Sequence, residues 1–375
     1  MRVLFLQQQP CVRAMKLAVG LRHALPGLEL GFAYQGKTLT EWYGSGDELF
    51  DRWWDLEDDA RAALPAILDE YAPDLIHSHN LPDTLTVLAN ELVSGEIPVV
   101  HDVHDLQSLR STPYENGFAQ PADSRMLERR AIEESAAVVT VSDELVAELA
   151  RRYRLPEHTL VFPNYALRRD VPRLLAFTEH RDGNPPKLVY QGTLSTNGGH
   201  YDLREIFRAV VAEGVSLDVY PSRPAPEYRE LAERVRGLTV HDTVDPSTLL
   251  GLLSKYDYGW AGFNEAMNKP HIDTALPNKL FEYLAAGLPV LTLNHRALKR
   301  FLRERGLGIA LDSPADLAGE LSRRDIDKLR RRVSAARYEF TVEANAGGPA
   351  ALYRSLLEQS EEPSARLSLS RTPSG

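Results

Sequence analysis

Short apolar runs alternate along the chain with longer segments in which apolar residues recur every three to four positions. The runs have the length of buried strands, and the longer segments have the period of amphipathic helices. Strands and helices that alternate at this spacing form right-handed βαβ units, so we predict a parallel sheet in each half of the chain. The strands predicted in the first half are 2–7, 28–34, 74–77, 97–100, 136–141 and 160–162. The helices predicted between them are 12–25, 57–71, 82–93, 124–135 and 143–153.

The second half repeats this rhythm and predicts a second domain. Its predicted strands are 188–191, 216–220, 239–241, 258–261, 290–293 and 308–311. Proline, glycine and charged residues without a sustained period separate the two halves, which is the composition of a linker. The chain is therefore divided into a first Rossmann-like domain at 1–165, a linker at 166–186, a second Rossmann-like domain at 187–345, a closing helix at 346–360 and a tail at 361–375. The tail is rich in serine, proline and charge, which predicts disorder.

Length and composition agree with a globular protein of two domains. A chain of 375 residues is too long for one hydrophobic core, and 43% hydrophobic with 26% charged residues are globular values. The formal net charge of −10 argues against a general affinity for nucleic acid, and the apolar runs are too short for a transmembrane segment. A single cysteine, Cys11, excludes an internal disulfide. We expect a cytoplasmic protein, with peripheral contact at the inner membrane face as an alternative.

The segment 277–292 carries the strongest chemical signal. A proline opens the predicted helix, Gly287 closes it, and a short apolar strand follows. Lys279 and Glu282 are three residues apart, so both project from one face near the amino-terminal end of the helix. Unpaired amides, the positive end of the helix dipole and a lysine favour a phosphate, and Glu282 can accept hydrogen bonds from both hydroxyls of a ribose. The pattern indicates a nucleotide site, and the alternative is an ordinary amphipathic helix with a Lys–Glu pair.

This segment resembles the donor-site helix of GT-B glycosyltransferases of the GT4-like group, whose pattern is P-x-K-x-x-E-Y-x-A-x-G-x-P-V. Less specific motifs in the same order extend the resemblance over residues 2–359. The resemblance implies an α/β fold of the GT-B type, in which two doubly wound Rossmann-like domains face each other across a cleft. The last helix is then expected to pack back on the first domain. It also implies that Glu282 holds the ribose and that the diphosphate binds at the helix start, at Pro277, Asn278, Lys279 and Leu280.

Further donor-binding residues are expected in the loops that follow the predicted strands of the second half. They are Gly192, Thr193, Gly198, Gly199, His200, Arg223, Val244, Asn264 and Glu265. Glu265 is expected to reach the donor sugar, because Thr274 stands eight residues before Glu282, where the family has a second glutamate.

The loop at 192–201 departs from the family in its charge. Family members usually carry an arginine or lysine in or after this loop, and here it contains neither. We expect the amides of Gly198 and Gly199 to form an anion nest, and His200 to become cationic beside the phosphates. Lys279 would then carry the main charge, with Arg223 or His271 in reserve.

Candidate residues for the acceptor follow strands of the first half. The resemblance implies that His104 contacts the transferred sugar. Residues of a strand alternate sides, so Asp102 shares a face with His104. The first loop lacks the glycines common in the family and offers polar side chains instead. The residues expected to bind the acceptor are Gln9, Arg13, His79 and Asp102.

We predict a glycosyltransferase that uses neither a metal nor a cofactor. Several histidines lie near carboxylates, but their spacing matches no metal-ligand pattern, and the family needs no divalent ion for its diphosphate. The expected reaction moves a sugar from a UDP-, GDP- or dTDP-linked donor to a hydroxyl of a glycan, lipid-linked or small-molecule acceptor. Retention of configuration is implied by the resemblance. The catalytic candidates are His104, Lys279 and Glu282.

Two alternatives remain open at the level of sequence. The missing phosphate cation favours a catalytically weak GT-B homologue that serves as a scaffold or binding subunit of a glycosyltransferase complex. The cluster at 101–105 would instead supply acid–base groups to a nucleotide-sugar 2-epimerase. A dehydrogenase is disfavoured, because the first loop lacks the G-x-G-x-x-G fingerprint.

Overall fold

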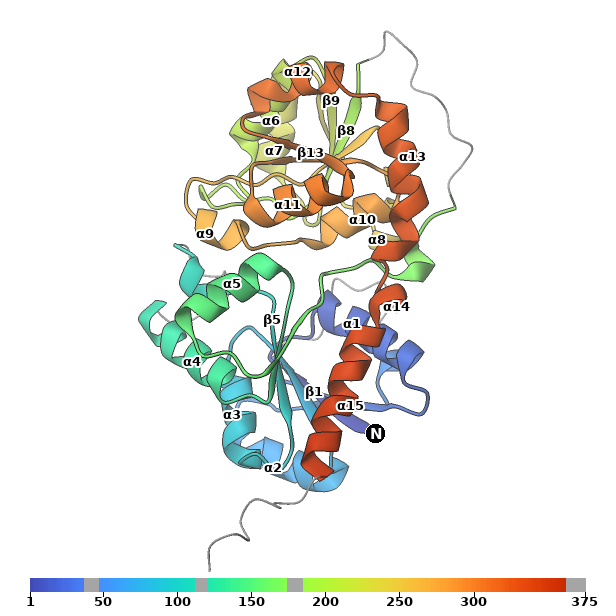
Figure 1. Ribbon diagram of the computed structural model, residues 1–375. Helices are drawn as coiled ribbons and strands as arrows, with labels where there is room; N and C mark the ends of the chain where they lie inside the picture. The colour runs from blue at the N-terminus through green and yellow to red at the C-terminus, as the bar shows by residue number, and fades with distance from the viewer. Residues whose placement is uncertain (37–46, 112–120, 174–184, 362–375) are drawn as a thin grey trace, which may run out of the picture.

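Two parallel β-sheets organise the computed structural model, which describes residues 1–36, 47–111, 121–173 and 185–361 (Figure 1). The first sheet has seven strands in the order β3-β2-β1-β4-β5-β6-β7. The order reverses between β1 and β4, which opens a crevice at the carboxyl ends of these strands. The strands are β1 (Arg2–Gln7), β2 (Glu29–Tyr34), β3 (Arg52–Asp55), β4 (Leu75–His79), β5 (Val99–Val103), β6 (Ala137–Thr140) and β7 (His158–Val161).

Helices bury both faces of the first sheet. They are α1 (Val12–Ala24), α2 (Ala60–Tyr71), α3 (Thr84–Val93), α4 (Pro121–Glu133) and α5 (Asp143–Arg152). Successive residues of β1 belong to different cores, because side chains alternate along a strand. Val3 and Phe5 pack with the apolar face of α1, whereas Leu4 and Leu6 pack with α2 and α3. Because both faces of β1 are buried, its sequence is a continuous run of apolar residues.

The second sheet has six strands in the order β10-β9-β8-β11-β12-β13. They are β8 (Lys187–Gly192), β9 (Ser216–Pro221), β10 (Leu238–Val240), β11 (Tyr258–Trp260), β12 (Val290–Leu293) and β13 (Gly308–Leu311). The helices around this sheet are α6 (Arg204–Ala212), α7 (Pro226–Arg234), α8 (Pro246–Leu253), α9 (Lys269–Ile272), α10 (Asn278–Ala285), α11 (Arg296–Arg305), α12 (Leu317–Ser322) and α13 (Ile326–Ala336). The two doubly wound sheets predicted from the sequence are confirmed.

Two local predictions differ from the structure. The helix expected at 57–71 begins at Ala60, because Glu57 has a left-handed φ of 49° and Asp59 caps the helix by accepting a hydrogen bond from Ala62 N. Strand β3 was not predicted. It has four residues at the edge of the sheet and no run of apolar side chains, so its sequence carries little strand signal.

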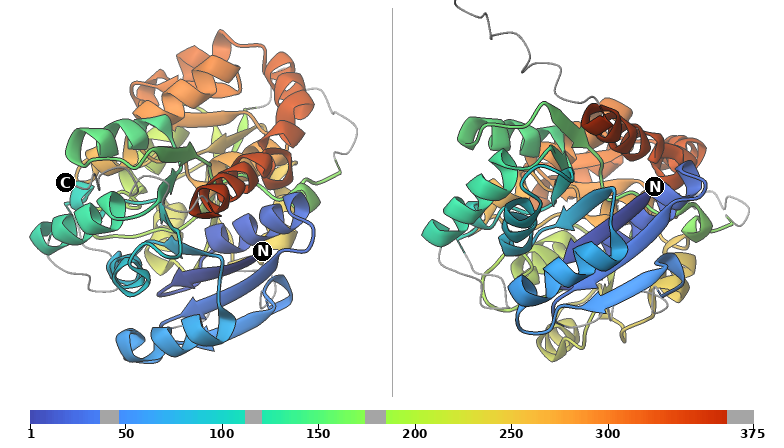
Figure 2. Two further views of the ribbon diagram at one scale, coloured as in Figure 1. Left: turned by 60° about the horizontal axis from the view of Figure 1, so that its bottom comes forward. Right: turned by 90° about the horizontal axis from the view of Figure 1, so that it is seen from below.

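The chain returns to the first domain after α13 through the 3₁₀ helix η5 (Arg337–Phe340), α14 (Val342–Asn345) and α15 (Gly347–Glu361). Both views of Figure 2 show α15 beside α1. Gly20 allows α1 to approach α14, since a Cβ built there would lie 2.6 Å from Val342 Cγ1. Val342 and Tyr353 are both buried in the core that contains β1 and α1. The end of the chain therefore completes the first domain.

The tail expected at 361–375 lies, from residue 362 on, outside the described residues, as does the part of the linker at 174–184. Within the residues that the structure describes, no helix combines the length and the apolar character needed to span a membrane.

A buried tyrosine ties α10 to two strands of the second sheet and gives a test of the packing. The Tyr283 hydroxyl accepts a hydrogen bond from Gln191 N at 3.0 Å and donates one to Trp260 O at 3.2 Å. Tyr283→Phe removes two hydrogen bonds to buried backbone groups, so we expect the free energy of unfolding to fall by about 1–3 kcal/mol. Urea unfolding followed by circular dichroism measures the change.

The matched control is Tyr165→Phe. Tyr165 is half-buried, and its hydroxyl makes no hydrogen bond to another described residue. A loss of stability in Tyr283→Phe no larger than that in Tyr165→Phe would contradict the role assigned to the Tyr283 hydroxyl.

Candidate active site

The first domain holds the segment that leads into α10. It contacts residues 268–278 of the second domain through hydrogen bonds and through one contact between a carboxylate and a histidine ring. These join Ser111 N to Asn268 Oδ1 (2.9 Å), Asp105 Oδ1 to His271 Nε2 (3.6 Å), Ser142 Oγ to Thr274 O (2.6 Å), Asn164 Nδ2 to Leu276 O (3.0 Å) and Lys16 Nζ to Asn278 Oδ1 (2.9 Å). Because the segment ends at the first turn of α10, these contacts fix where that helix points.

The start of α10 has the geometry expected of a phosphate site. Pro277 is the N-cap in extended conformation (φ −74°, ψ 157°), and no side chain caps the helix. The amides of Asn278 and Lys279 are therefore left without a partner inside the helix. At the other end, Gly287 has a φ of +78°, which satisfies the requirement for a left-handed residue there.

Lys279 lies in a buried aromatic environment. Its Nζ donates a hydrogen bond to the Tyr190 hydroxyl at 2.9 Å and lies 5.2 Å from the centre of the Phe263 ring. Burial lowers the pKa of Lys279 to about 7, against the opposing charge of Glu282. The side chain is 7% exposed, so the alternative of an ordinary surface pair between Lys279 and Glu282 is wrong.

Glu282 is partly exposed beside the end of β8. It is about one-quarter exposed, it accepts a hydrogen bond from Gln191 Nε2 at 2.6 Å, and Lys16 Nζ lies 3.8 Å away. Sequence analysis missed both neighbours. The position of Gln191 at the carboxyl end of a buried strand was a usable signal. Lys16 gave none, because a lysine on a helix is ordinarily solvated.

The loop after β8 is anchored close to Lys279. Gly192 has a φ of +123°, and a Cβ built on it would lie 3.5 Å from Lys279 Nζ. The Tyr190 hydroxyl donates to Thr193 O at 2.6 Å and accepts from Lys279 Nζ at 2.9 Å, so the predicted Thr193 lies close to this lysine. Ser222 N donates to Gly192 O at 3.0 Å, so the exposed Arg223 that follows lies next to this loop.

The expected anion nest is not available. Gly198 N donates to Asp202 Oδ2 and Gly199 N donates to Asn197 Oδ1, each at 3.0 Å. These acceptors occupy the amides that were expected to bind phosphate, so the prediction is wrong for this structure. Asn197 and the nearby Asp202 thus accept hydrogen bonds from the amides of the loop itself.

By itself His200 is a neutral ring, and the expectation that it becomes cationic beside the phosphates stays a prediction. Burial, together with the charges of His271 and Arg110, lowers the pKa of His200 to about 3, so the ring is neutral at physiological pH. Its Nδ1 shares a hydrogen bond with Asn268 Nδ2 at 3.1 Å. His200 therefore supports Asn268, which accepts a hydrogen bond from Ser111 N of the first domain.

The remaining donor-side predictions lie near this loop. Asn264 N donates to His200 O at 3.1 Å, and Asn264 Nδ2 donates to Asp202 O at 3.1 Å, so this residue braces the loop. Val244 packs against the core around α10. Glu265 Oε1 lies 3.0 Å from Lys269 Nζ and 3.1 Å from His295 Nδ1, and its contact with a sugar stays a prediction.

The acceptor-side predictions divide into buried and exposed residues. Asp102 is fully buried and receives hydrogen bonds from Arg13 Nε at 2.7 and 3.0 Å. Burial raises the pKa of Asp102, but Arg13 and the surrounding histidines hold it well below its usual range. His79 is fully buried beside this pair, 3.7 Å from Asp102. We predicted that Arg13, His79 and Asp102 contact the acceptor. The structure instead buries all three in a network around the Asp102 carboxylate, so this prediction is wrong.

His104 is the member of this network that is partly exposed to solvent. Its side chain is 19% exposed, and its Nδ1 lies 3.6 Å from Asp102 Oδ1. Asn80 Oδ1 accepts a hydrogen bond from His104 N at 3.2 Å. Gln9, in the first loop, is exposed. Of the predicted acceptor-side residues, Gln9 and His104 thus present atoms to solvent.

One group of side chains has the spacing of possible metal ligands. One ligand atom from each of His77, His79 and Asp102 lies within 4.8 Å of the others, and all three residues are buried. Arg13 already neutralises Asp102, and burial lowers the pKa of both histidines. A divalent ion there would bring a net positive charge into the core, so the residues do not fit a metal.

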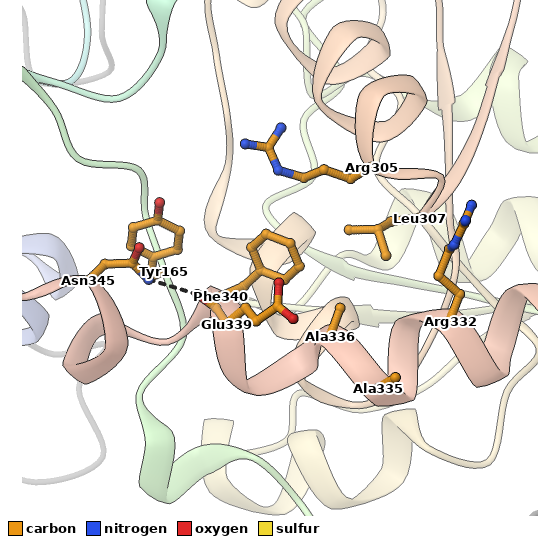
Figure 3. Close-up of a pocket in the computed structure, with 9 residues that line it drawn as sticks. All are labelled: Tyr165, Arg305, Leu307, Arg332, Ala335, Ala336, Glu339, Phe340 and Asn345. Carbon is orange, nitrogen blue, oxygen red and sulfur yellow. Dashed lines mark hydrogen bonds between the residues drawn. The ribbon is translucent and has the colours of Figure 1, made fainter.

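A hollow at the crossovers between the domains is separate from this site. It has a volume of about 650 Å³, and Figure 3 shows Tyr165 of the outgoing chain opposite Phe340 of the returning chain. Arg305 and Arg332 contribute charged side chains to its rim. The residues that line it include no predicted donor or acceptor residue.

Two family models match the chain on either side of the linker. A glycosyl transferase 4-like domain matches residues 12–165, and a glycosyl transferase-like model matches residues 203–346. The fold and the geometry around α10 agree with them. The chain belongs to the GT4-like, or group 1, family of glycosyltransferases.

Solved structures share the fold over nearly the whole chain. A sucrose-phosphate synthase from Thermosynechococcus elongatus is 16% identical with a TM-score of 0.63, over 96% of this chain and 100% of that chain. A glycosyltransferase from Rickettsia africae is 14% identical with a TM-score of 0.64, over 96% and 98%. HepE from Anabaena, solved in complex with UDP, is 14% identical with a TM-score of 0.59, over 96% and 98%. At these identities the similarity establishes the GT-B fold alone. No curated protein sequence matches the chain.

The buried Lys279 predicts how diphosphate binding depends on pH. Its pKa of about 7 must rise when a diphosphate binds, because the ligand stabilises the charged ammonium. Above pH 7 the binding of a nucleoside diphosphate at this lysine would therefore take up a proton, and its affinity should fall by up to about tenfold per pH unit. Below pH 7 the lysine is already charged, and this dependence disappears.

Titration calorimetry between pH 7 and 9, in buffers of different ionisation enthalpy, measures both the affinity and the proton uptake. Lys279→Met should remove most of the proton uptake, whereas the exposed control Lys255→Met should retain it. Equal pH dependence in the parent and in Lys279→Met would place the titrating group elsewhere.

Proposed function

We propose that the protein transfers a sugar from a nucleoside diphosphate sugar to a hydroxyl acceptor without the help of a metal ion or cofactor. The observation that carries this proposal is the arrangement at the start of α10. Free amides and Lys279 favour phosphate there, and Glu282 one turn further on presents a partly exposed carboxylate. Diphosphate next to ribose is what a nucleotide sugar offers such a site. UDP is the first donor nucleotide to test, because HepE was solved with it.

Cleavage of the bond between sugar and diphosphate places negative charge on the leaving oxygens. The amides of α10 and the Lys279 ammonium are aimed at that position before the reaction starts, which is where a fixed electrostatic site lowers the barrier most. The contacts between the domains bury much of this region, and exclusion of water protects the sugar from hydrolysis. Retention of configuration is proposed by analogy with the family, and no protein nucleophile is assigned.

The acceptor is proposed to enter beside the first domain. The side chain of His104 is partly exposed, and the buried Asp102 below holds it in place. Gln9 offers an exposed amide at the rim. These groups fit a hydroxyl compound such as a glycan, a lipid-linked sugar or a small molecule.

The transferase is preferred to the two alternatives on specific observations. The alternative of a scaffold protein was based on the absence of a lysine or arginine from the loop at 192–201. Lys279, however, lies next to Gly192 in this loop.

The epimerase needs two acid–base groups from 101–105 beside the sugar. His104 is partly exposed, but Asp102 is fully buried and paired with Arg13. His101 is fully buried, with its Nδ1 2.9 Å from Thr86 Oγ1 and its Nε2 3.3 Å from Asp83 Oδ1, so it does not reach a sugar.

The deciding experiment incubates the protein with UDP-, GDP- and dTDP-sugars and measures release of free nucleotide with and without candidate acceptors. Acceptor-dependent release with formation of a glycosylated product supports the proposal. Binding of a nucleotide sugar without any release would favour the scaffold, and conversion of the donor sugar to its 2-epimer would favour the epimerase.

Glu282→Gln should weaken binding and turnover of the nucleotide sugar and leave the fold intact. Loss of the charge on the group that accepts the ribose hydrogen bonds should cost roughly ten- to a hundred-fold in affinity. Calorimetric titration with a nucleoside diphosphate measures it. Glu227→Gln, at an exposed position in the same domain, is the matched control. Unchanged affinity in a folded Glu282→Gln protein would mean that α10 has a structural role and does not bind the ribose.

Chelation with EDTA should leave transferase activity nearly unchanged. The proposed diphosphate site uses amides and side-chain cations, and the acidic group at its edge, Glu282, is engaged by Gln191. Initial rates before and after dialysis against EDTA test this. Activity that disappeared on chelation and returned with Mg²⁺ or Mn²⁺ would overturn the metal-free mechanism.

A further inference from the structure

The second domain places one buried lysine, Lys279, beside Gly192 and an exposed arginine, Arg223, next to the same loop. The amides of Gly198 and Gly199 are occupied, and His200 is neutral at physiological pH. Lys279 is the lysine next to Gly192, and it loses part of its charge near pH 7 because it is buried. A diphosphate that leaves with two to three negative charges therefore calls for another cation at the start of α10.

Lys16 of the first domain reaches this position. It projects from α1, its Nζ donates a hydrogen bond to Asn278 Oδ1 at 2.9 Å, and it lies 3.8 Å from Glu282 Oε1. Asn278 is the first residue of α10, where the phosphates are proposed to bind, and Glu282 is the proposed partner of the ribose. The ammonium group thus lies between the two parts of the proposed nucleotide site.

The environment of Lys16 leaves its charge incompletely balanced. The residue is 4% exposed, its nearest acceptor is a neutral amide, and the carboxylate of Glu282 is beyond hydrogen-bonding distance. Burial lowers the pKa of Lys16, and the charges of Glu282 and Asp170 oppose this effect. The ion pair with Glu282 at 3.8 Å is a loose one for a buried ammonium, and an anionic ligand at this place would add a closer counter-ion.

Anchoring of α1 does not require this lysine. The helix already buries Ala14, Met15 and Leu17 in the first-domain core. Arg13, one turn earlier on the same face, pairs with Asp102. The neutral hydrogen bonds from Ser142 and Asn164 also join the domains. An apolar side chain of similar length would satisfy packing at position 16 at lower electrostatic cost.

We propose that Lys16 is a donor-binding cation supplied by the opposite domain, and that it binds an oxygen of the nucleotide diphosphate. This inference rests on the proposed function. It means that the full positive charge of the phosphate site is assembled from both domains and exists when α1 and α10 are in contact. Closure of the domains and stabilisation of the leaving group are then one event.

The test compares UDP with uridine, which share the base and the ribose and differ in the diphosphate. Lys16→Met should weaken UDP about ten- to a hundred-fold and uridine less than about twofold. Lys16→Arg should stay within a few-fold of the parent for UDP, because it keeps the charge. Lys255→Met is the exposed control, and dissociation constants come from calorimetry for UDP and from ligand-observed NMR for uridine.

Each outcome separates the proposals. If Lys16→Met loses affinity for UDP and for uridine equally, Lys16 only positions Glu282 for the ribose. If its affinity for both equals that of the parent, Lys16 is not part of the site. Either result overturns the inference and leaves the proposed transferase function standing. A parent protein that binds none of UDP, GDP and dTDP would instead overturn the proposed function. If Lys16→Met fails to fold, as judged by circular dichroism, Lys16→Gln provides the same comparison.

Discussion

A buried ion pair in the first domain sets the geometry on which the cleft depends. Asp102 is fully buried at the end of β5, and a charge in that place must be neutralised by a partner held in a fixed position. Arg13 is that partner, and its other end donates to Phe162 O at 2.8 Å and to Asn164 Oδ1 at 3.0 Å. Asn164 in turn donates to Leu276 O, two residues before α10. The need to neutralise one carboxylate thus aligns the two domains.

The distribution of charge in the cleft follows from burial. Burial lowers the pKa of side chains that can carry positive charge, to about 3 for His200 and to about 7 for Lys279. An anion that binds near these groups raises their pKa values again. The positive charge of the site therefore depends on whether an anionic ligand is bound. The aromatic ring of Tyr190 below Lys279 supports such a cation without adding a negative charge that would repel phosphate.

Sequence analysis recovered the features that depend on local periodicity and on a contiguous motif. The parallel strands and α10 with its proline and glycine ends are of this kind. It missed what depends on partners distant in the sequence: Lys16 meets Asn278 across 262 positions, and Gln191 meets Glu282 across 91. The anion nest failed for a related reason, because glycines reveal which backbone can turn and do not reveal which side chain already occupies its amides.

The return of the chain to its starting domain has a consequence for biosynthesis. Tyr353 on α15 is fully buried, and its hydroxyl lies 2.6 Å from His77 Nδ1 in the core of the first domain. A ribosome that has released the first 165 residues has therefore not yet released all of that core. The second domain, made of one continuous segment, has its strands and helices available earlier. Vectorial synthesis thus favours completion of the second domain first, and the first domain is sealed only when the last helix leaves the exit tunnel.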